Sequence, residues 1–155
     1  VMAIDTSFEN AFIKCQLAAS NPLPEKGTLF VSVKDTDKAK ILPIIRSFSK
    51  QGFKILATSG TAQYLIDGGV KAKVINKVSQ GSPHCVDALL DDKIDIVINT
   101  TETRKSINDS FGIRRTALIM NIPYSLTVSG ARACINSIKR LKAEDITVNP
   151  ITSFH

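Results

Sequence analysis

The stretch Phe53-Lys54-Ile55-Leu56-Ala57-Thr58-Ser59-Gly60-Thr61 decides the fold of this 155-residue chain. Its first residues, up to Ala57, are apolar and β-prone enough to form a strand. The hydroxyl-rich loop that follows opens directly into a short helical pattern that runs to Asp67. A strand that leads through a tight loop into a helix is the repeating unit of a parallel sheet covered by helices.

The same alternation continues on both sides of this stretch. One helix is expected to end at Gly52 in the left-handed conformation, with Phe53 making the apolar contact that accompanies such an end. Further strands are predicted over 28–33, 70–78, 94–98 and 122–128, and further helices over 84–92, 106–121 and 131–141. We therefore predict an α/β fold with a doubly wound, mostly parallel five-stranded sheet and helices on both faces.

Three flanking segments surround the predicted domain, which covers residues 28–142. Residues 1–20 read as an amphipathic helix, residues 21–27 as a linker rich in proline and glycine, and residues 143–155 as a tail. The apolar face of the first helix needs burial, either on this domain or against the rest of a larger protein. Because the chain begins with Val1-Met2, we expect it to be a piece of something longer.

Composition narrows the function classes. No apolar run reaches 18 residues, no signal pattern is visible, and the three scattered cysteines form neither a disulfide framework nor a metal spacing. These features favour a cytoplasmic protein with reduced thiols. The net charge is +6, but the basic residues are dispersed and aromatic side chains are few, so a local anion site is favoured over nucleic-acid binding.

The loop Thr58-Ser59-Gly60-Thr61 is the best candidate for that anion site. Gly60 permits close approach of the backbone, hydroxyls flank it, and the free N–H groups at a helix start favour a phosphate. On its own the loop is more typical of a capped helix start than of an anion site. Its expected neighbours at the carboxyl ends of the other strands strengthen the hypothesis, namely Ser32, Lys34, Lys38, Asn76, Lys77, Asn99, Thr100 and Thr101.

Groups for catalysis are sparse. His84 is the only internal histidine, and its position at a predicted helix start favours capping or a surface role. Asp35 and Asp37 could act as acid–base groups but are better explained as helix caps. Arg114, in the next-to-last helical pattern, could line the pocket rim or pair with Asp109, and a structural role is favoured. No nucleophile–histidine arrangement, metal cluster or Walker pattern is present in the sequence.

Taken in order, these residues resemble the methylglyoxal-synthase-like domain at the C-terminal end of the carbamoyl phosphate synthetase large chain. The likeness runs from about Gly27 to Leu141. Its pieces are Ser32-Val33, Asp37-Lys38, Gln51-Gly52-Phe53, Ala57-Thr58-x-Gly60-Thr61-Ala62, Asn76-Lys77-Val78, Pro83-His84, Ile98-Asn99-Thr100-Thr101, Ile113-Arg114-Arg115-Thr116-Ala117-Leu118 and Ile122-Pro123-Tyr124. The first 20 residues resemble the end of the preceding synthetase unit.

The resemblance implies a non-catalytic allosteric domain that binds the inhibitor UMP and the activator IMP at one shared site. The effectors would control the ATP- and glutamine-dependent synthesis of carbamoyl phosphate for pyrimidines and arginine. The matching effector positions are Lys38, Thr58, Thr61, Lys77, Asn99 and Thr101, with Ser32, Gly60 and Thr100 close by. Implied partners are the rest of the large chain, the small glutamine-amidotransferase subunit and further copies of the assembly. The domain itself needs no cofactor, whereas the full enzyme, an ATP-dependent ligase, uses ATP with magnesium or manganese.

Two departures and one alternative accompany the resemblance. Leu126 stands where the family carries a threonine that contacts ornithine in some members, so ornithine activation is in doubt, and Gln80-Gly81-Ser82 replaces a Glu-Gly-Arg loop. The alternative function is a free-standing methylglyoxal synthase-type lyase, which eliminates phosphate. That enzyme needs histidines at the strand ends, where this chain has Lys34-Asp35 and Ser106-Ile107-Asn108-Asp109.

Overall fold

The computed structural model describes residues 1–102 and 104–154, without the side chains of Arg104, Lys105, Ser106 and Asp109. One five-stranded sheet, in the order β3-β2-β1-β4-β5, forms its centre. The strands are β1 (Thr28–Ser32), β2 (Lys54–Ala57), β3 (Lys73–Val74), β4 (Ile96–Asn99) and β5 (Tyr124–Ser125). The four strand pairings are parallel, which confirms the predicted doubly wound α/β fold.

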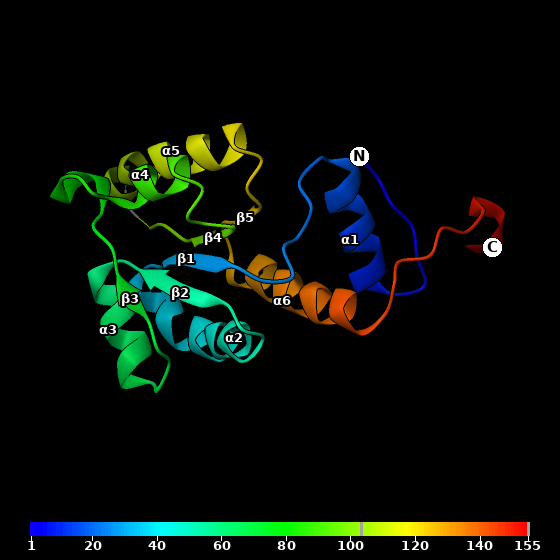
Figure 1. Cartoon of the computed structure of the whole chain (residues 1–155), viewed down its shortest axis with the longest axis horizontal. Coiled ribbons are helices and arrows are strands. Elements are labelled where there is room, and N and C mark those ends of the chain that lie inside the picture. The colour runs from blue at the N-terminus through cyan, green and yellow to red at the C-terminus, as the bar shows by residue number, and fades with distance from the viewer. Residues whose placement is uncertain (103, 155) are drawn as a thin grey trace.

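Helices cover both faces of the sheet (Figure 1). One face carries α2 (Lys38–Lys50), α3 (Ser59–Asp67) and α6 (Val128–Ala143), and the other carries α4 (Cys85–Leu90) and α5 (Arg104–Ile119). Short 3-10 helices are η1 (Asp35–Asp37), η2 (Val78–Gln80) and η3 (Ile151–Phe154). None of the described helices combines the length and apolar character needed to cross a membrane.

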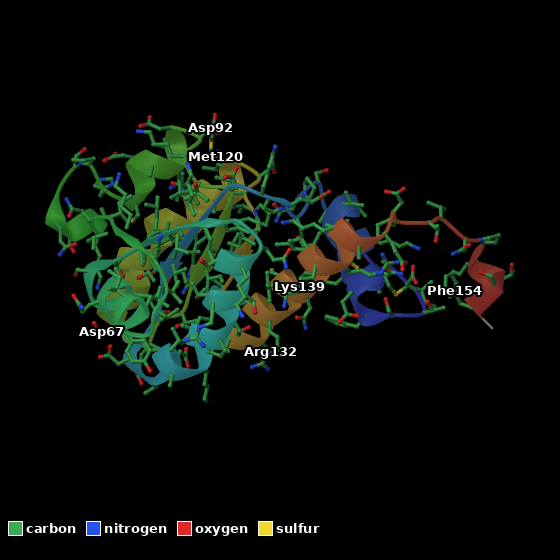
Figure 2. All side chains as sticks on the ribbon, turned by 60° about the horizontal axis from the view of Figure 1, so that its bottom comes forward. Asp67, Asp92, Met120, Arg132, Lys139 and Phe154 are labelled. Atoms are coloured by element: carbon green, nitrogen blue, oxygen red, sulfur yellow. The ribbon has the colours of Figure 1, made fainter. Side chains whose placement is uncertain are left out.

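Side chains of β1 point alternately to the two faces of the sheet and enter a hydrophobic core on each face. Leu29 and Val31 point to the α2–α6 side, whereas Phe30 points to the α4–α5 side, and each of the three is fully buried. A strand buried on both faces needs apolar residues at every position, which is why this run lacks the polar alternation of a surface strand. On α6 the periodicity is helical instead, because Ile135 and Ile138 are buried. Arg132 and Lys139 of the same helix are exposed (Figure 2).

The N-terminal helix α1 (Phe8–Ala18) packs on the outside of α6. Ser7 caps it, because its hydroxyl accepts a hydrogen bond from the Asn10 N–H at 3.2 Å. Ile13 is buried in the main core, but Phe8 remains 63% exposed. The helix therefore buries one side of its apolar surface on this domain and leaves another side uncovered.

The predicted end of α2 is confirmed. Gly52 has a φ of +94°, and the Phe53 N–H donates to the Phe48 carbonyl at 3.1 Å. The two aromatic rings meet edge to face, with centroids 5.3 Å apart. Glycine satisfies the left-handed position at no steric cost, and the aromatic contact fixes the direction in which β2 leaves the helix.

Several predicted boundaries are wrong. The strand predicted over 70–78 is only Lys73–Val74, because Val70 closes α3 by donating its N–H to the Leu65 carbonyl at 2.9 Å. The strand predicted over 122–128 is only Tyr124–Ser125, since the Thr127 hydroxyl accepts from the Gly130 N–H and starts α6 early. Helix α5 begins at Arg104, within the predicted loop 99–105, whose residue 103 lies outside the described residues.

Candidate functional site

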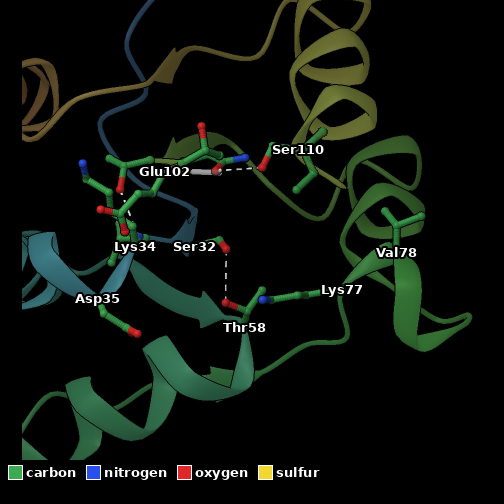
Figure 3. A pocket seen from close by; sticks show the side chains of 13 residues that line it. Ser32, Lys34, Asp35, Thr58, Lys77, Val78, Glu102 and Ser110 are labelled. Carbon is green, nitrogen blue, oxygen red and sulfur yellow. Dashed lines mark hydrogen bonds between the residues drawn. The ribbon is translucent and has the colours of Figure 1, made fainter. Parts of the chain in front are cut away.

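The pocket of greatest interest opens where the strand order reverses, at the carboxyl ends of β1 and β4. Open parallel sheets bind their ligands at this position, because the two neighbouring connections leave in opposite directions. The pocket has a volume of about 260 Å³. Its lining comes from the ends of four strands and from α5, and Figure 3 shows it: Ser32, Val33, Lys34, Asp35, Thr58, Lys77, Val78, Asn99, Thr100, Thr101, Glu102, Ser110 and Ile113.

The ends of β1 and β4 are held in register by polar contacts. Ser32 pairs with Asn99 across the ladder, and the Ser32 carbonyl accepts a hydrogen bond from the Thr100 N–H at 3.1 Å. The Thr100 hydroxyl in turn accepts from the Lys34 N–H at 3.1 Å. Thr100 therefore fixes the course of the chain after β1 and keeps a hydroxyl proton to donate elsewhere.

Asn99 is the most informative polar residue of the pocket. Its side chain is buried, with 1% of the residue exposed, and its Oδ1 atom accepts from the Ser110 hydroxyl at 3.3 Å. The Nδ2 atom is buried and has no hydrogen-bond partner among the described residues. Buried donors are rarely left unpaired, so this amide marks the place where an acceptor of a ligand would fit.

A hydrogen bond joins Thr101, which lines the pocket, to Arg114 on α5. Arg114 Nη2 donates to the Thr101 hydroxyl at 3.0 Å, and the buried Arg114 Nε has no partner within the described part of the chain. Arg114 is not among the residues that line the pocket, but it contacts one of them, Thr101. The alternative partner, Asp109, has a side chain outside the described residues.

The loop between β2 and α3 contributes hydroxyls and free N–H groups. The buried Thr58 hydroxyl donates to the Ser32 hydroxyl at 3.2 Å, a bond drawn in Figure 3. The Thr58 carbonyl accepts from the N–H groups of Thr61 and Ala62. No described acceptor takes the N–H groups of Ser59 and Gly60, so this helix start retains the donors that favour an anion.

Thr61 has a different position from the one predicted by the motif. Its side chain is buried at 3% exposure and does not line the pocket. Its hydroxyl accepts from the Val33 N–H at 3.3 Å and lies 3.5 Å from the Thr58 hydroxyl. Thr61 thereby connects the end of β1 to the first turn of α3. Its role is to stabilise the residues that line the pocket rather than to line it.

We expect Thr61→Val to lower the free energy of unfolding by about 1–3 kcal/mol, because the buried Val33 N–H loses its acceptor. Thr61→Ser keeps the hydroxyl and serves as the matched control, with a smaller loss. Urea denaturation of both variants measures the difference. Equal stability of the valine variant and the wild type would contradict this role for Thr61.

Lysines bring positive charge to the site, and Lys34 is one of the residues that line it. Lys77 lines the pocket, and Figure 3 shows its ammonium directed toward Thr58. Lys38 lies beside the start of α3, where its Nζ atom is 3.6 Å from the position that a Cβ on Gly60 would take. Lys38 also pairs with Asp35 at 2.7 Å. This hydrogen bond and charge, and more weakly the charge of Lys77, lower the pKa of Asp35 below its ordinary value.

The predicted site residues therefore divide into three groups. Ser32, Thr58, Lys77, Asn99, Thr100 and Thr101 line the pocket. Lys38 and Gly60 lie together at its edge, and Thr61 supports it. The sequence interpretation missed Ser110, although its spacing from Ile113 and Ala117 puts all three on the buried side of one helix. Asp35 was expected to cap a helix and instead joins the lining.

His84 lies outside this pocket. It caps α4, since its Nδ1 atom accepts from the Asp87 N–H at 3.3 Å, and its own N–H donates to the Asp87 carboxylate at 2.9 Å. This reciprocal pair is a capping box, which confirms the capping role predicted for the histidine.

Comparison with known proteins agrees with this architecture. Residues 40–126 match the model of the MGS-like domain. The carbamoyl phosphate synthase large chain of Rhizobium meliloti is 46% identical over 154 residues, which are 99% of this chain and 13% of that protein. The C-terminal section of the corresponding large chain of Methanopyrus kandleri is 42% identical over 156 residues, 100% of this chain and 29% of that protein.

A solved structure shares the fold. The methylglyoxal synthase of Elizabethkingia anophelis superposes with a TM-score of 0.57 and 17% identity, covering 79% of this chain and 81% of that one. The chain spans less than a third of the length of the two large-chain relatives described above. The chain belongs to the MGS-like domain family, and within that family it resembles the members found in carbamoyl phosphate synthase large chains.

Proposed function

We propose that this chain is a regulatory domain of a carbamoyl phosphate synthase and that its pocket binds nucleoside monophosphates. UMP as inhibitor and IMP as activator would share the site. The observation that carries the proposal is the pocket at the reversal of strand order, which is lined by the ammonium of Lys77 and the unpaired Asn99 Nδ2 and lies next to the helix start where the N–H groups of Ser59 and Gly60 are free.

Each part of such a ligand has a chemical counterpart in the pocket. The phosphate fits the start of α3 between Lys38 and Lys77, where N–H groups and ammonium groups supply donors and positive charge. The ribose or base fits the β4 side, where Asn99 Nδ2 and the hydroxyls of Thr100 and Thr101 can donate. Val33, Val78 and Ile113 supply apolar contact for a base.

The lining gives more support to binding than to catalysis. Among the described residues that line the pocket there is no histidine; of the two acidic residues there, Asp35 pairs with Lys38 and Glu102 lies on the β4 side. A phosphate-eliminating lyase needs a positioned base and acid next to its substrate. We therefore propose that the domain senses nucleotides, and that it acts on the remainder of a synthase through a coupling free energy on the order of 1–3 kcal/mol.

Calorimetric titration of the chain with UMP and with IMP tests the proposal. We expect both nucleotides to bind with one-to-one stoichiometry, and each to compete with the other. Failure of both to bind at millimolar concentration would overturn the proposed function. Production of methylglyoxal from dihydroxyacetone phosphate above background would instead favour the lyase.

A further inference from the structure

A carboxylate lies within the cationic part of the pocket. Asp35 Oδ1 is 2.7 Å from Lys38 Nζ, and the Asp35 side chain is 90% exposed whereas that of Lys38 is 18% exposed. The hydrogen bond and charge of Lys38, and more weakly the charge of Lys77, hold the pKa of this carboxyl group below its ordinary value. Glu102 also lines the pocket, but on the β4 side. Asp35 is therefore the acidic group nearest to the lysine at the start of α3.

The local fold around Asp35 does not depend on its ion pair with Lys38. The 3-10 helix that contains Asp35 is held by its backbone, since the Asp37 N–H donates to the Lys34 carbonyl at 3.1 Å and the Lys38 N–H donates to the Asp35 carbonyl. A solvent-exposed carboxylate that reaches a largely covered ammonium behaves as an internal counterion. It neutralises Lys38 as long as no other anion is bound.

We propose that Asp35 is a specificity-determining residue that makes the pocket favour nucleoside monophosphates over diphosphates and triphosphates. The proposal rests on the proposed function, in that a phosphorylated nucleotide binds here. A phosphate at the start of α3 lies next to Lys38, because Lys38 Nζ is 3.6 Å from the position that a Cβ on Gly60 would take. The Asp35 carboxylate and the phosphate of the ligand then both contact the ammonium of Lys38.

Repulsion between the Asp35 carboxylate and the phosphate groups of the ligand grows with the charge of the ligand. At about 4 Å in water, each pair of like unit charges lowers affinity about fivefold. A monophosphate can displace Asp35 from Lys38 and let the carboxylate turn into solvent. Further phosphate groups add negative charge on the open side of the pocket, where the displaced carboxylate remains. Each added phosphate group is therefore expected to lower the affinity of the nucleotide further.

Asp35→Asn and Asp37→Asn are the matched pair of variants that test this. Both remove one negative charge from the same 3-10 helix, but Asp37 does not line the pocket and its side chain makes no capping hydrogen bond. The affinities for UMP, UDP and UTP are measured at fixed ionic strength without magnesium, and circular dichroism checks the fold. Asparagine retains the shape of the side chain and the backbone hydrogen bonds.

We expect Asp35→Asn to strengthen binding of UMP, UDP and UTP by factors that increase in that order, with a gain for UTP at least about fivefold larger than that for UMP, so that the preference for the monophosphate shrinks. Asp37→Asn should change each affinity less than about twofold. Equal effects of the two substitutions, or an equal gain for the three nucleotides, would overturn the role of Asp35 and leave the proposed function intact. A wild-type chain that binds none of them would overturn the proposed function itself.

Discussion

Lys77→Ala is expected to weaken binding of UMP and of IMP about 10- to 150-fold. The Lys77 ammonium lines the pocket and points toward Thr58, so it meets the proposed phosphate position. A hydrogen bond to a charged group contributes about 1.5–3 kcal/mol, which corresponds to this range of affinity. Because both effectors carry the same phosphate, the loss should be similar for the two nucleotides.

Calorimetry on Lys77→Ala and on Lys71→Ala separates a local effect from a loss of overall charge. Lys71 is exposed, precedes β3 and does not line the site at β1 and β4. Its removal should leave binding within about twofold. If the two variants bound UMP equally well, the phosphate would not lie beside Lys77.

Phe48→Ala is expected to lower the free energy of unfolding by about 3–5 kcal/mol. The Phe48 ring is fully buried between α2 and the sheet and packs edge to face on Phe53. Its truncation removes apolar contacts and leaves a cavity that rigid strands on one side cannot fill. Since small domains are stable by only about 5–15 kcal/mol, the variant should be near its limit at ordinary temperature.

Urea denaturation followed by circular dichroism measures this loss. Phe111→Ala is the control, because Phe111 lies on the outside of α5 with 63% of its surface exposed. That substitution should change stability by no more than about 0.5 kcal/mol. A loss below about 1 kcal/mol for Phe48→Ala would contradict the arrangement of the core described above.

The fold was predictable because local and tertiary signals agree along most of the chain. The buried strands Thr28–Ser32 and Ile96–Asn99 are apolar runs, and Gly52 ends a helix as expected. The short edge strands were not predictable in length. β3 has two exposed residues, and its extent depends on pairing with β2 rather than on any apolar pattern of its own.

The site was predictable as far as its residues follow the strands directly. Ser32, Thr58, Asn99 and Thr100 are adjacent to strand ends, and parallel pairing brings those ends together. Contacts that depend on side-chain direction were not predictable. The sequence motif alone does not distinguish Thr61, whose hydroxyl turns toward Val33, from Thr58, which faces the pocket.

The most direct test of the account is where a nucleotide binds. Amide chemical shifts of the labelled chain, recorded by NMR during titration with UMP and then with IMP, locate the site residue by residue. We predict that both nucleotides move the same signals, concentrated at Lys34, Ser59, Gly60, Lys77 and Thr100. Unchanged signals at millimolar nucleotide would contradict a nucleotide site at the ends of β1 and β4. Changes concentrated on Lys71 and Lys73, at β3, would contradict it as well.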